Sequence, residues 1–193
     1  MTLHTLAAPA SHAVEVKHSR FLAQAVPAES PEAALAWLSA SGDRDATHNC
    51  WAYRIGAQYR SSDDGEPAGT AGRPILAAID GQGYDQVVVV VTRWYGGINL
   101  GAGGLVRAYG GTAAECLRRA ERRPLIAMDE VRLSCDFADS AEIHAAVAAF
   151  GAEKREEHFD AEGVRFVLSV PVDRIEALKA RLRDATRNRV RFA

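Results

Sequence analysis

Five consecutive valines, Val87–Val91, restrict the fold of this chain more than any other feature. β-Branched side chains favour extended backbone, and the side chains of a strand point alternately to its two faces. A run that is apolar at every position therefore predicts a strand that is buried on both faces, at the centre of a sheet.

Length and composition place this strand in a globular protein of two domains. The 193 residues can form two small domains, and Arg122-Arg123-Pro124 ends a predicted helix, so we expect domains at residues 1–124 and 125–193. No apolar run reaches the ~18 residues that cross a bilayer, so no membrane contact is expected. The first twelve residues do not resemble a signal peptide and are expected to form a loose terminus. The net charge is −2, so RNA binding would need a local basic patch.

The three cysteines, Cys50, Cys116 and Cys135, are odd in number and widely spaced. No two of them have the C-x-x-C spacing of a metal site, and Cys116 and Cys135 fall at apolar positions of predicted elements. We therefore expect free cysteines, no metal, no cofactor and a cytoplasmic protein.

The elements of the first domain follow from apolar periodicity and helix caps. Arg20–Val26 and Cys50–Ile55 are predicted strands, and Ser30-Pro31-Glu32 is typical of a helix start. The stretch Arg60–Pro74 is rich in Gly, Pro and Asp, which predicts a loop. In the long helix after the valine strand, Gly110-Gly111 predicts a break or a close contact.

The second domain is predicted to have the element order βαββαβ. Alternating apolar residues over 131–137 and 164–170 predict strands, and Arg189–Ala193 predicts a short final strand. Asp139 or Ser140 is expected to cap one helix, and Asp173 with Glu176 the other. This order is that of a ferredoxin-like fold, so the expected fold class is α+β.

A glycine-rich segment between the valine strand and the long helix is the first candidate site. Backbone N–H groups and the dipole of a helix start favour an anion there. Arg93 and Arg107 flank the segment, and both are expected to point toward the same anion. The spacing matches neither a Walker A loop nor G-x-G-x-x-G, and turn geometry alone is the alternative explanation. The candidate glycines are Gly96, Gly97, Gly101, Gly103 and Gly104.

Three carboxylates within four positions, Asp63, Asp64 and Glu66, form the second candidate site. Such a cluster could bind a hard cation, supply a general acid or base, or form ion pairs. The spacing is not that of an EF-hand, and we favour ion pairs. Their candidate partners are Arg73, Arg93 and Arg107.

His48 and Cys50 fall on one face of a predicted strand, which raises the alternative of a catalytic pair. No glycine-rich turn surrounds Cys50, so we expect a packed cysteine and a histidine that hydrogen-bonds the neighbouring loop. No catalytic residue is assigned.

Two further groups bear on binding. Arg187, Arg189 and Arg191 alternate, so on a strand they would form a phosphate-facing stripe or, as we favour, the charged protection of an edge strand. Trp94 and Tyr95 are either packed against the valine strand or exposed anchors for a partner protein.

Three segments taken together resemble the signature of the YigZ/IMPACT family. They are residues 46–50, SSDDGEPAGTAGRPIL at 61–76 and VVVTRWYGGINLGAGGLVRAY at 89–109. The resemblance covers residues 19–120, and the remainder of the chain is similar to the small C-terminal domain of the bacterial members.

The resemblance implies a first domain like domain IV of elongation factor G and related ribosomal-protein domains, and a ferredoxin-like second domain. It also implies a role near translation, because the eukaryotic IMPACT branch is a translational regulator that competes for a protein partner. The implied partners are RNA, the ribosome or a translation-related protein, and no reaction is implied. Besides the glycines and arginines above, the implied functional surface contains Asp63, Asp64, Gly65, Glu66 and Thr70, with His48 beside them.

One departure from the family pattern concerns this surface. Asn99 stands where many relatives have a lysine, which removes a cation from the glycine loop. The leading hypothesis is a module that binds RNA or the ribosome. The alternatives are an enzyme acting on a phosphorylated or nucleotide ligand and a protein–protein interaction module. The sequence defines no oligomeric state.

Overall fold

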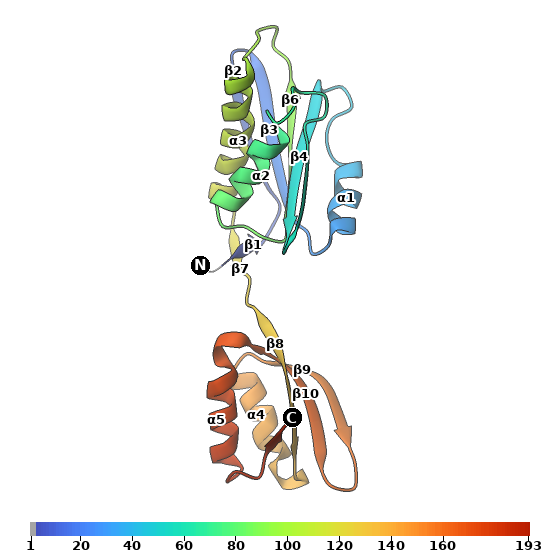
Figure 1. Ribbon diagram of the computed structural model, residues 1–193, viewed down its shortest axis with the longest axis vertical. Coiled ribbons are helices and arrows are strands. Elements are labelled where there is room, and N and C mark those ends of the chain that lie inside the picture. The colour runs from blue at the N-terminus through green and yellow to red at the C-terminus, as the bar shows by residue number, and fades with distance from the viewer. Residues whose placement is uncertain (1–2) are drawn as a thin grey trace. The chain divides into compact units, whose positions relative to one another are not determined.

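The computed structural model describes residues 3–193, which fold into two compact units (Figure 1). The first unit ends at Leu125 and the second runs from Ile126 to Ala193. Both units combine helices with antiparallel sheets, as expected for the α+β class. No helix among the described residues has both the length and the apolar character needed to span a membrane.

The first unit is built on a five-stranded sheet with the order β2-β3-β6-β4-β5, in which every neighbouring pair is antiparallel. Helices α2 and α3 cover one face, and α1 covers part of the other. The strands are β2 (Ala10–Val16), β3 (Ser19–Pro27), β4 (His48–Ile55), β5 (Gln58–Ser62) and β6 (Val87–Trp94). The helices are α1 (Pro31–Ala40), α2 (Gly72–Gly81) and α3 (Ala102–Arg119).

The valine run forms the centre of this sheet, as predicted. All five valines of β6 are at most 2% exposed. Val87, Val89 and Val91 belong to the core under α2 and α3, whereas Val88 packs on the opposite face in a small cluster that includes Ala34 of α1. Helices on both faces thus explain how a strand of an antiparallel sheet can be apolar throughout.

The predicted helix start at Ser30 is also confirmed. The Ser30 hydroxyl accepts a hydrogen bond from the Ala33 N–H at 3.2 Å, and Pro31 occupies the first helical position, where its missing N–H needs no partner.

Residues 3–18 are ordered, which corrects the expectation of a loose terminus, except at residues 1 and 2, which lie outside the described part of the chain. Two short strands, β1 (His4–Leu6) and β7 (Arg122–Pro124), pair antiparallel, and β2 forms a hairpin with β3. The physical reason is that Leu6, which is 1% exposed, fills a place in the main core.

The loop predicted over Arg60–Pro74 is shorter than expected. Its first residues complete β5 and its last residues start α2, so that residues 63–71 form the loop. The glycines near position 72, which suggested a turn, lie in or beside the first turn of that helix.

Helix α3 runs unbroken through Gly110-Gly111, so the predicted break is absent and the close contact is present. A Cβ atom at Gly110 would lie 3.3 Å from Cβ of Pro74 in α2, whereas one at Gly111 would meet nothing within 4 Å. Gly110 therefore allows the two helices to pack closely.

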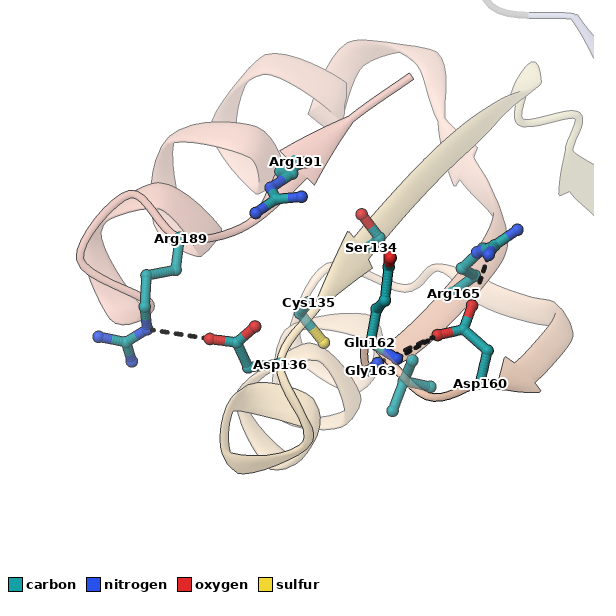
Figure 2. A pocket seen from close by; sticks show the side chains of 10 residues that line it. Ser134, Cys135, Asp136, Asp160, Glu162, Gly163, Arg165, Arg189 and Arg191 are labelled. Atoms are coloured by element: carbon teal, nitrogen blue, oxygen red, sulfur yellow. Dashed lines mark hydrogen bonds and ion pairs between the residues drawn. The ribbon is translucent and has the colours of Figure 1, made fainter.

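The second unit is ferredoxin-like, as predicted. Its sheet has the order β11-β8-β10-β9, and α4 and α5 pack against one face. A polar pocket lies at one end of the sheet (Figure 2). The strands are β8 (Met128–Cys135), β9 (Glu153–Phe159), β10 (Val164–Pro171) and β11 (Arg191–Phe192), and the helices are α4 (Ser140–Ala149) and α5 (Ile175–Ala185).

The predicted side-chain caps of α4 and α5 are absent. A short 3-10 turn precedes each helix, η1 (Phe137–Asp139) and η2 (Val172–Arg174). The chain therefore enters each helix already in the helical backbone region, whereas a capping side chain requires extended backbone at that position. The Asp139 carboxylate instead accepts hydrogen bonds from Arg189 at 2.6 and 3.0 Å.

Because of the same contact, Arg187, Arg189 and Arg191 do not share one strand, although both the phosphate-facing stripe and the favoured protection of an edge strand required it. Arg189 is directed to Asp139, and Arg187 lies in a turn with φ of 48°, so Arg191 is the one member of the three on β11. Asn188 in that turn has φ of 62°, a conformation that asparagine tolerates better than most residues.

Candidate functional site

Both candidate segments of the first unit lie at the same end of the sheet. The acidic loop, residues 63–71, connects β5 to α2, and the glycine loop, residues 95–101, connects β6 to α3. His48 begins β4 and is paired in register with Arg93 near the end of β6. The sheet thus brings together residues that are 45 positions apart in the sequence.

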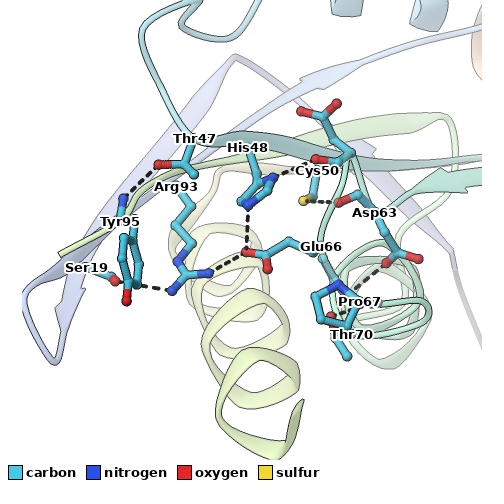
Figure 3. A network of polar contacts seen from close by, with 12 residues as sticks. Ser19, Thr47, His48, Cys50, Asp63, Glu66, Pro67, Thr70, Arg93 and Tyr95 are labelled. Carbon is cyan, nitrogen blue, oxygen red and sulfur yellow. Dashed lines mark hydrogen bonds and ion pairs between the residues drawn. The ribbon is translucent and has the colours of Figure 1, made fainter. Parts of the chain in front are cut away.

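The centre of this region is a buried ion pair between Glu66 and Arg93 (Figure 3). Arg93 Nη1 donates to Glu66 Oε1 at 2.6 Å, and the hydroxyl of Tyr109 in α3 donates to the same oxygen at 2.7 Å. Arg93 is 5% exposed and Glu66 8%. A buried carboxylate without such partners would carry a large desolvation cost, so each partner is required by the other.

The rest of the Arg93 guanidinium touches β3 and two aromatic rings. Nη2 donates to the Ser19 hydroxyl at 3.4 Å, and the group lies 5.5 Å from the ring centre of Phe21 and 5.3 Å from that of Tyr95. Within residues 3–193, Nε of Arg93 is a buried nitrogen without a hydrogen-bond partner. Arg93 is therefore part of the interior and does not face solvent beside Arg107, contrary to expectation.

His48 links the ion pair to the acidic loop. Its Nδ1 lies 2.7 Å from the carbonyl oxygen of Asp64, which can only accept, so we assign the proton to Nδ1. In the neutral ring, Nε2 is then unprotonated and faces Glu66 Oε1 at 3.9 Å. This is the histidine–loop hydrogen bond that the sequence predicted.

Cys50 is a packed cysteine, as expected. Its thiol is fully buried and donates to the carbonyl oxygen of Asp63 at 2.9 Å. Burial, reinforced by the nearby carboxylates, raises the pKa of Cys50 to about 12, although the neighbouring Tyr109 hydroxyl acts in the opposite direction. A thiol with such a pKa is a poor nucleophile.

The other two carboxylates shape the loop instead of forming ion pairs. The Asp63 carboxylate accepts hydrogen bonds from the N–H groups of Gly69, Ala71 and Gly72 at 2.8–3.0 Å. Asp64 Oδ2 accepts one from the Asn49 N–H at 2.6 Å. Of the three predicted acids, Glu66 alone is paired with an arginine.

Burial opposes ionisation of Asp63, but the three N–H donors, with the charge of Arg73, outweigh it and lower its pKa. In the same loop the Thr70 hydroxyl, which is buried, donates to the carbonyl oxygen of Pro67 at 2.6 Å. The acidic loop is thus fixed by its own side chains at the start of α2.

The glycine loop packs closely against the turn between β2 and β3. A Cβ atom at Gly96 would lie 2.1 Å from the carbonyl group of His18, so no other residue fits without displacing backbone. The Gly96 N–H donates to the Ser19 hydroxyl at 3.1 Å, and the Tyr95 N–H to the Thr47 hydroxyl at 2.9 Å. These contacts fix the start of the loop.

The end of the loop forms the start of α3. Gly101 takes the N-cap position with φ of 70°, and no side chain caps the first N–H groups of the helix. Lys17, Leu100, Gly104 and Arg107 are among the residues that line a pocket of about 220 Å³ beside this helix start. Lys17 and Arg107 are exposed, and neither forms an ion pair with a carboxylate of residues 3–193.

The two aromatic residues after the valine run differ in exposure. Tyr95 is 45% exposed, whereas Trp94 is half-buried, donates to Asp43 Oδ2 at 3.2 Å, and lies under the Arg20 guanidinium.

Arg73 is exposed at the start of α2. Within the described part of the chain, no three His, Cys, Asp or Glu side chains are grouped as a metal site requires.

Sequence reasoning did not find three residues of this region: Ser19, Tyr109 and Lys17. Tyr109 occupies the apolar stripe of α3, so its position predicted core packing, and only its hydroxyl distinguishes it from a pure core residue. Ser19 and Lys17 carry no local signal, because they lie at the start of β3 and in the turn before it, and the pairing of β3 with β6 brings this turn close to residues far along the chain.

Comparison with known proteins first defines the class of this molecule. Residues 17–117 match the family model of the Impact N-terminal domain, and residues 133–189 match that of a domain of unknown function, DUF1949. The two matched regions lie within the two structural units, and the first contains both candidate loops. A solved structure described as a hypothetical protein is similar over 99% of this chain and 96% of its own, with a TM-score of 0.72 and 34% identity.

The chain belongs to the IMPACT family. It is 52% identical over 177 residues to an IMPACT family member of Thermus thermophilus, covering 91% of this chain and 97% of the relative. It is 36% identical over 191 residues to the IMPACT family member YigZ of Escherichia coli, covering 94% and 92%. Protein IMPACT of Oryctolagus cuniculus is 38% identical over 105 residues, which are 48% of this chain and 32% of that protein.

Proposed function

We propose that the first domain, residues 1–124, binds RNA, as free RNA or in the ribosome, and that the protein acts as a translation-associated regulator. The binding surface consists of the glycine loop, the start of α3, Lys17 and Arg107. The observation that carries the proposal is the uncapped start of α3 with these two exposed cations beside it, neither of which is paired with a carboxylate of residues 3–193.

These groups have the chemistry that a phosphate backbone requires. The free N–H groups at a helix start can donate to phosphate oxygens, and the helix dipole favours negative charge there. The Arg107 guanidinium can bind a phosphate through two parallel hydrogen bonds, whereas Lys17 acts as a mobile point charge. Exposed Tyr95 provides a ring on which a base can stack.

The buried ion pair has a positioning role in this proposal. Glu66 and Arg93 connect the acidic loop to β6, and Ser19 connects Arg93 to the Gly96 N–H. The pair therefore holds the glycine loop in the shape that presents the helix start. Glu66 also neutralises Arg93, so that the exposed cations remain the ones that attract an anion.

The test measures binding of ribosomes, by co-sedimentation, and of a labelled RNA, by fluorescence anisotropy, across a salt series. The variant is Lys17→Gln/Arg107→Gln. We expect its RNA affinity to fall about tenfold at 100 mM salt and its log–log salt slope to decrease by about 1.5, because each phosphate contact contributes roughly 0.7–0.9.

The matched control is Arg118→Gln/Arg119→Gln. It removes two cations from the opposite end of α3, where both are paired with Glu115. Equal affinities of the two double variants, or binding that does not respond to salt, would overturn the proposal.

A second candidate function rests on the apolar part of the glycine loop. Tyr95 and Ile98 are 45% and 41% exposed, which suits contact with a translation-related protein. A Tyr95→Ala/Ile98→Ala variant would then lose a partner protein while keeping its RNA affinity. Salt-independent binding lost in this variant would favour the second candidate over the first.

A further inference from the structure

The sheet of the second unit has a pocket at one end, beside the face that no helix covers. Helices α4 and α5 pack on the other face, which carries Val131, Leu133 and the other buried residues of β8 and β10. At the pocket, Ser134 of β8 is paired in register with Arg165 of β10 and Arg191 of β11. The volume is about 330 Å³, within the range of roughly 300–1,000 Å³ that small-molecule sites occupy.

The lining of the pocket carries both signs of charge in equal number. Its charged side chains are three arginines and three carboxylates: Arg165, Arg189, Arg191, Asp136, Asp160 and Glu162. A polyanion would meet the three carboxylates, and a polycation would meet the three guanidinium groups. Charges of like sign brought together are costly, so the lining disfavours any ligand that carries only one sign of charge.

Most of these charges are already paired. Arg165 contacts Asp160 at 2.5 Å. Arg189 contacts Asp139 at 2.6 Å, and Asp136 lies 3.9 Å from the same guanidinium group. These four members of the lining therefore need no partner from a ligand.

One cation and one anion of the lining remain. Among residues 3–193, the Arg191 guanidinium has no carboxylate within 4 Å, and the Glu162 carboxylate has no cation within that distance. The Ser134 hydroxyl forms no hydrogen bond with the same part of the chain. The pocket thus presents a free donor group, a free acceptor group and a hydroxyl that can act as either.

The turn that carries Glu162 has a fixed backbone. Asp160 Oδ1 accepts hydrogen bonds from the N–H groups of Glu162 and Gly163 at 2.8 and 3.1 Å. A Cβ atom at Gly163 would lie 2.2 Å from the carbonyl oxygen of Cys135, so the turn packs directly on the end of β8. Glu162 and Arg191 therefore line the pocket from two ordered elements, the turn after β9 and strand β11 (Figure 2).

We propose that this pocket binds a free amino acid, with its carboxylate on Arg191 and its ammonium group on Glu162 and the Ser134 hydroxyl. A guanidinium group binds a carboxylate through two parallel hydrogen bonds, and an ammonium group donates to carboxylate and hydroxyl oxygens. A free amino acid carries both groups on one carbon atom, so it satisfies both free charges of the pocket and adds no net charge.

A second hollow, of about 510 Å³, adjoins the pocket and provides room for the side chain of the amino acid. Both hollows are lined by Ser134, Arg165 and Arg191, and half-buried Val167 lines the larger one. Val167 provides an apolar contact, which suits an aliphatic side chain. The two hollows use no residue of the first unit, so the proposal does not depend on the function proposed for that unit.

The test uses the full chain and isothermal titration calorimetry with each of the twenty protein amino acids at up to about 10 mM, which detects dissociation constants near 1 mM. We expect an aliphatic amino acid to bind. Arg191→Gln and Glu162→Gln should each weaken its binding at least about tenfold, because each variant leaves one charge of the ligand without its partner. Both residues are exposed, and circular dichroism checks that the variants are folded.

Two derivatives of the amino acid that binds most tightly test the two contacts separately. The N-acetyl derivative lacks the ammonium group, and the amide lacks the carboxylate. The wild type should prefer the free amino acid to either derivative at least about tenfold, whereas Glu162→Gln should no longer discriminate against the N-acetyl derivative, nor Arg191→Gln against the amide. Equal binding of all three compounds to the wild type would contradict the proposal.

Arg181→Gln and Glu176→Gln are the matched controls. Both residues are exposed on α5, on the helical side of the sheet, and each has a partner of opposite charge. Both variants should bind the amino acid like the wild type. If no amino acid binds, or if Arg191→Gln and Glu162→Gln bind like the wild type, the proposal is wrong.

The variant Lys17→Gln/Arg107→Gln separates this proposal from the one for the first unit. It should bind the amino acid with the affinity of the wild type, whatever its affinity for RNA. Loss of amino-acid binding in this variant would place the amino-acid site in the first unit and overturn the proposal.

Discussion

Glu66 is the residue on which the candidate site of the first unit most depends. Its carboxylate is buried and neutralises Arg93, which is buried as well. Glu66→Gln keeps the size and one hydrogen-bond acceptor but leaves the Arg93 charge uncompensated. We expect a loss of about 3 kcal/mol in the free energy of unfolding of the first unit, measured by urea denaturation.

Asp80→Asn provides the comparison for that prediction. Asp80 forms an ion pair with Arg54 at the surface, so removing this pair should lower the free energy of unfolding by less than about 1 kcal/mol. Similar costs for the two variants would show that burial of the Glu66–Arg93 pair is not what makes it important.

The sequence predicted which residues belong to the candidate site better than it predicted which of them contact one another. Glu66 and Arg93 were both candidates, but so were Arg73 and Arg107, and nothing local distinguishes the arginine that strand β6 directs inward from those on helix surfaces. The hydroxyls of Ser19 and Tyr109 complete the network from positions where the sequence gives no sign of a polar contact. Which residues meet is decided by strand register and helix packing, which are long-range properties.

The start of α2 depends on the side chain of Asp63, which lies eight residues before Ala71 and nine before Gly72. The Asp63 carboxylate binds the N–H groups of Ala71 and Gly72, and its pKa is lowered by the donors around it. The pKa of Asp63 is lower in the folded state than in the unfolded state, where it is about 3.9. Ionised Asp63 therefore stabilises the protein at pH values above the pKa of the unfolded state, and this stabilisation is lost as the pH falls through the pKa of the folded state.

Asp63→Asn should therefore destabilise the first unit by about 2 kcal/mol at pH 7, with a smaller difference from wild type near pH 3. Urea midpoints at the two pH values measure this. Asp45→Asn, at an exposed aspartate of the same unit, should change neither midpoint. A difference for Asp63→Asn that is as large at pH 3 as at pH 7 would contradict the proposed role of its charge.

The adjacent glycines of α3 provide an internal comparison. Alanine is favoured over glycine in a helix interior by about 1 kcal/mol. Gly111→Ala adds a methyl group in open space and should raise the free energy of unfolding by nearly that amount, whereas Gly110→Ala crowds Pro74 and should gain less or lose stability. Chemical denaturation of both variants measures the difference, and an equal gain for both would show that α2 and α3 adjust freely.

Elements with a strong periodic signal were predicted well, and those defined by partners were not. The valine strand and the Ser30 cap follow from local chemistry. The helix over 72–81 was hidden by the glycines and proline at its start, and the strand over 4–6 exists because β7 pairs with it. Helices α4 and α5 lack the expected caps because a 3-10 turn precedes each of them, and no residue pattern predicted these turns.

For the whole molecule, the division at Leu125 predicts that each unit folds by itself. Each has its own buried core, and we expect fragments 1–125 and 126–193 to show separate cooperative thermal transitions by circular dichroism. The two transitions should add up to the unfolding curve of the full chain. A fragment that remains unfolded alone would show that it needs the other unit.

The pairing of β1 with β7 has a consequence for how the first unit can be used. His4 lies opposite Pro124, so the entrance and the exit of this unit are neighbours in space. A unit closed in this way can be inserted into, or attached to, a longer polypeptide at a single point without disturbing its interior.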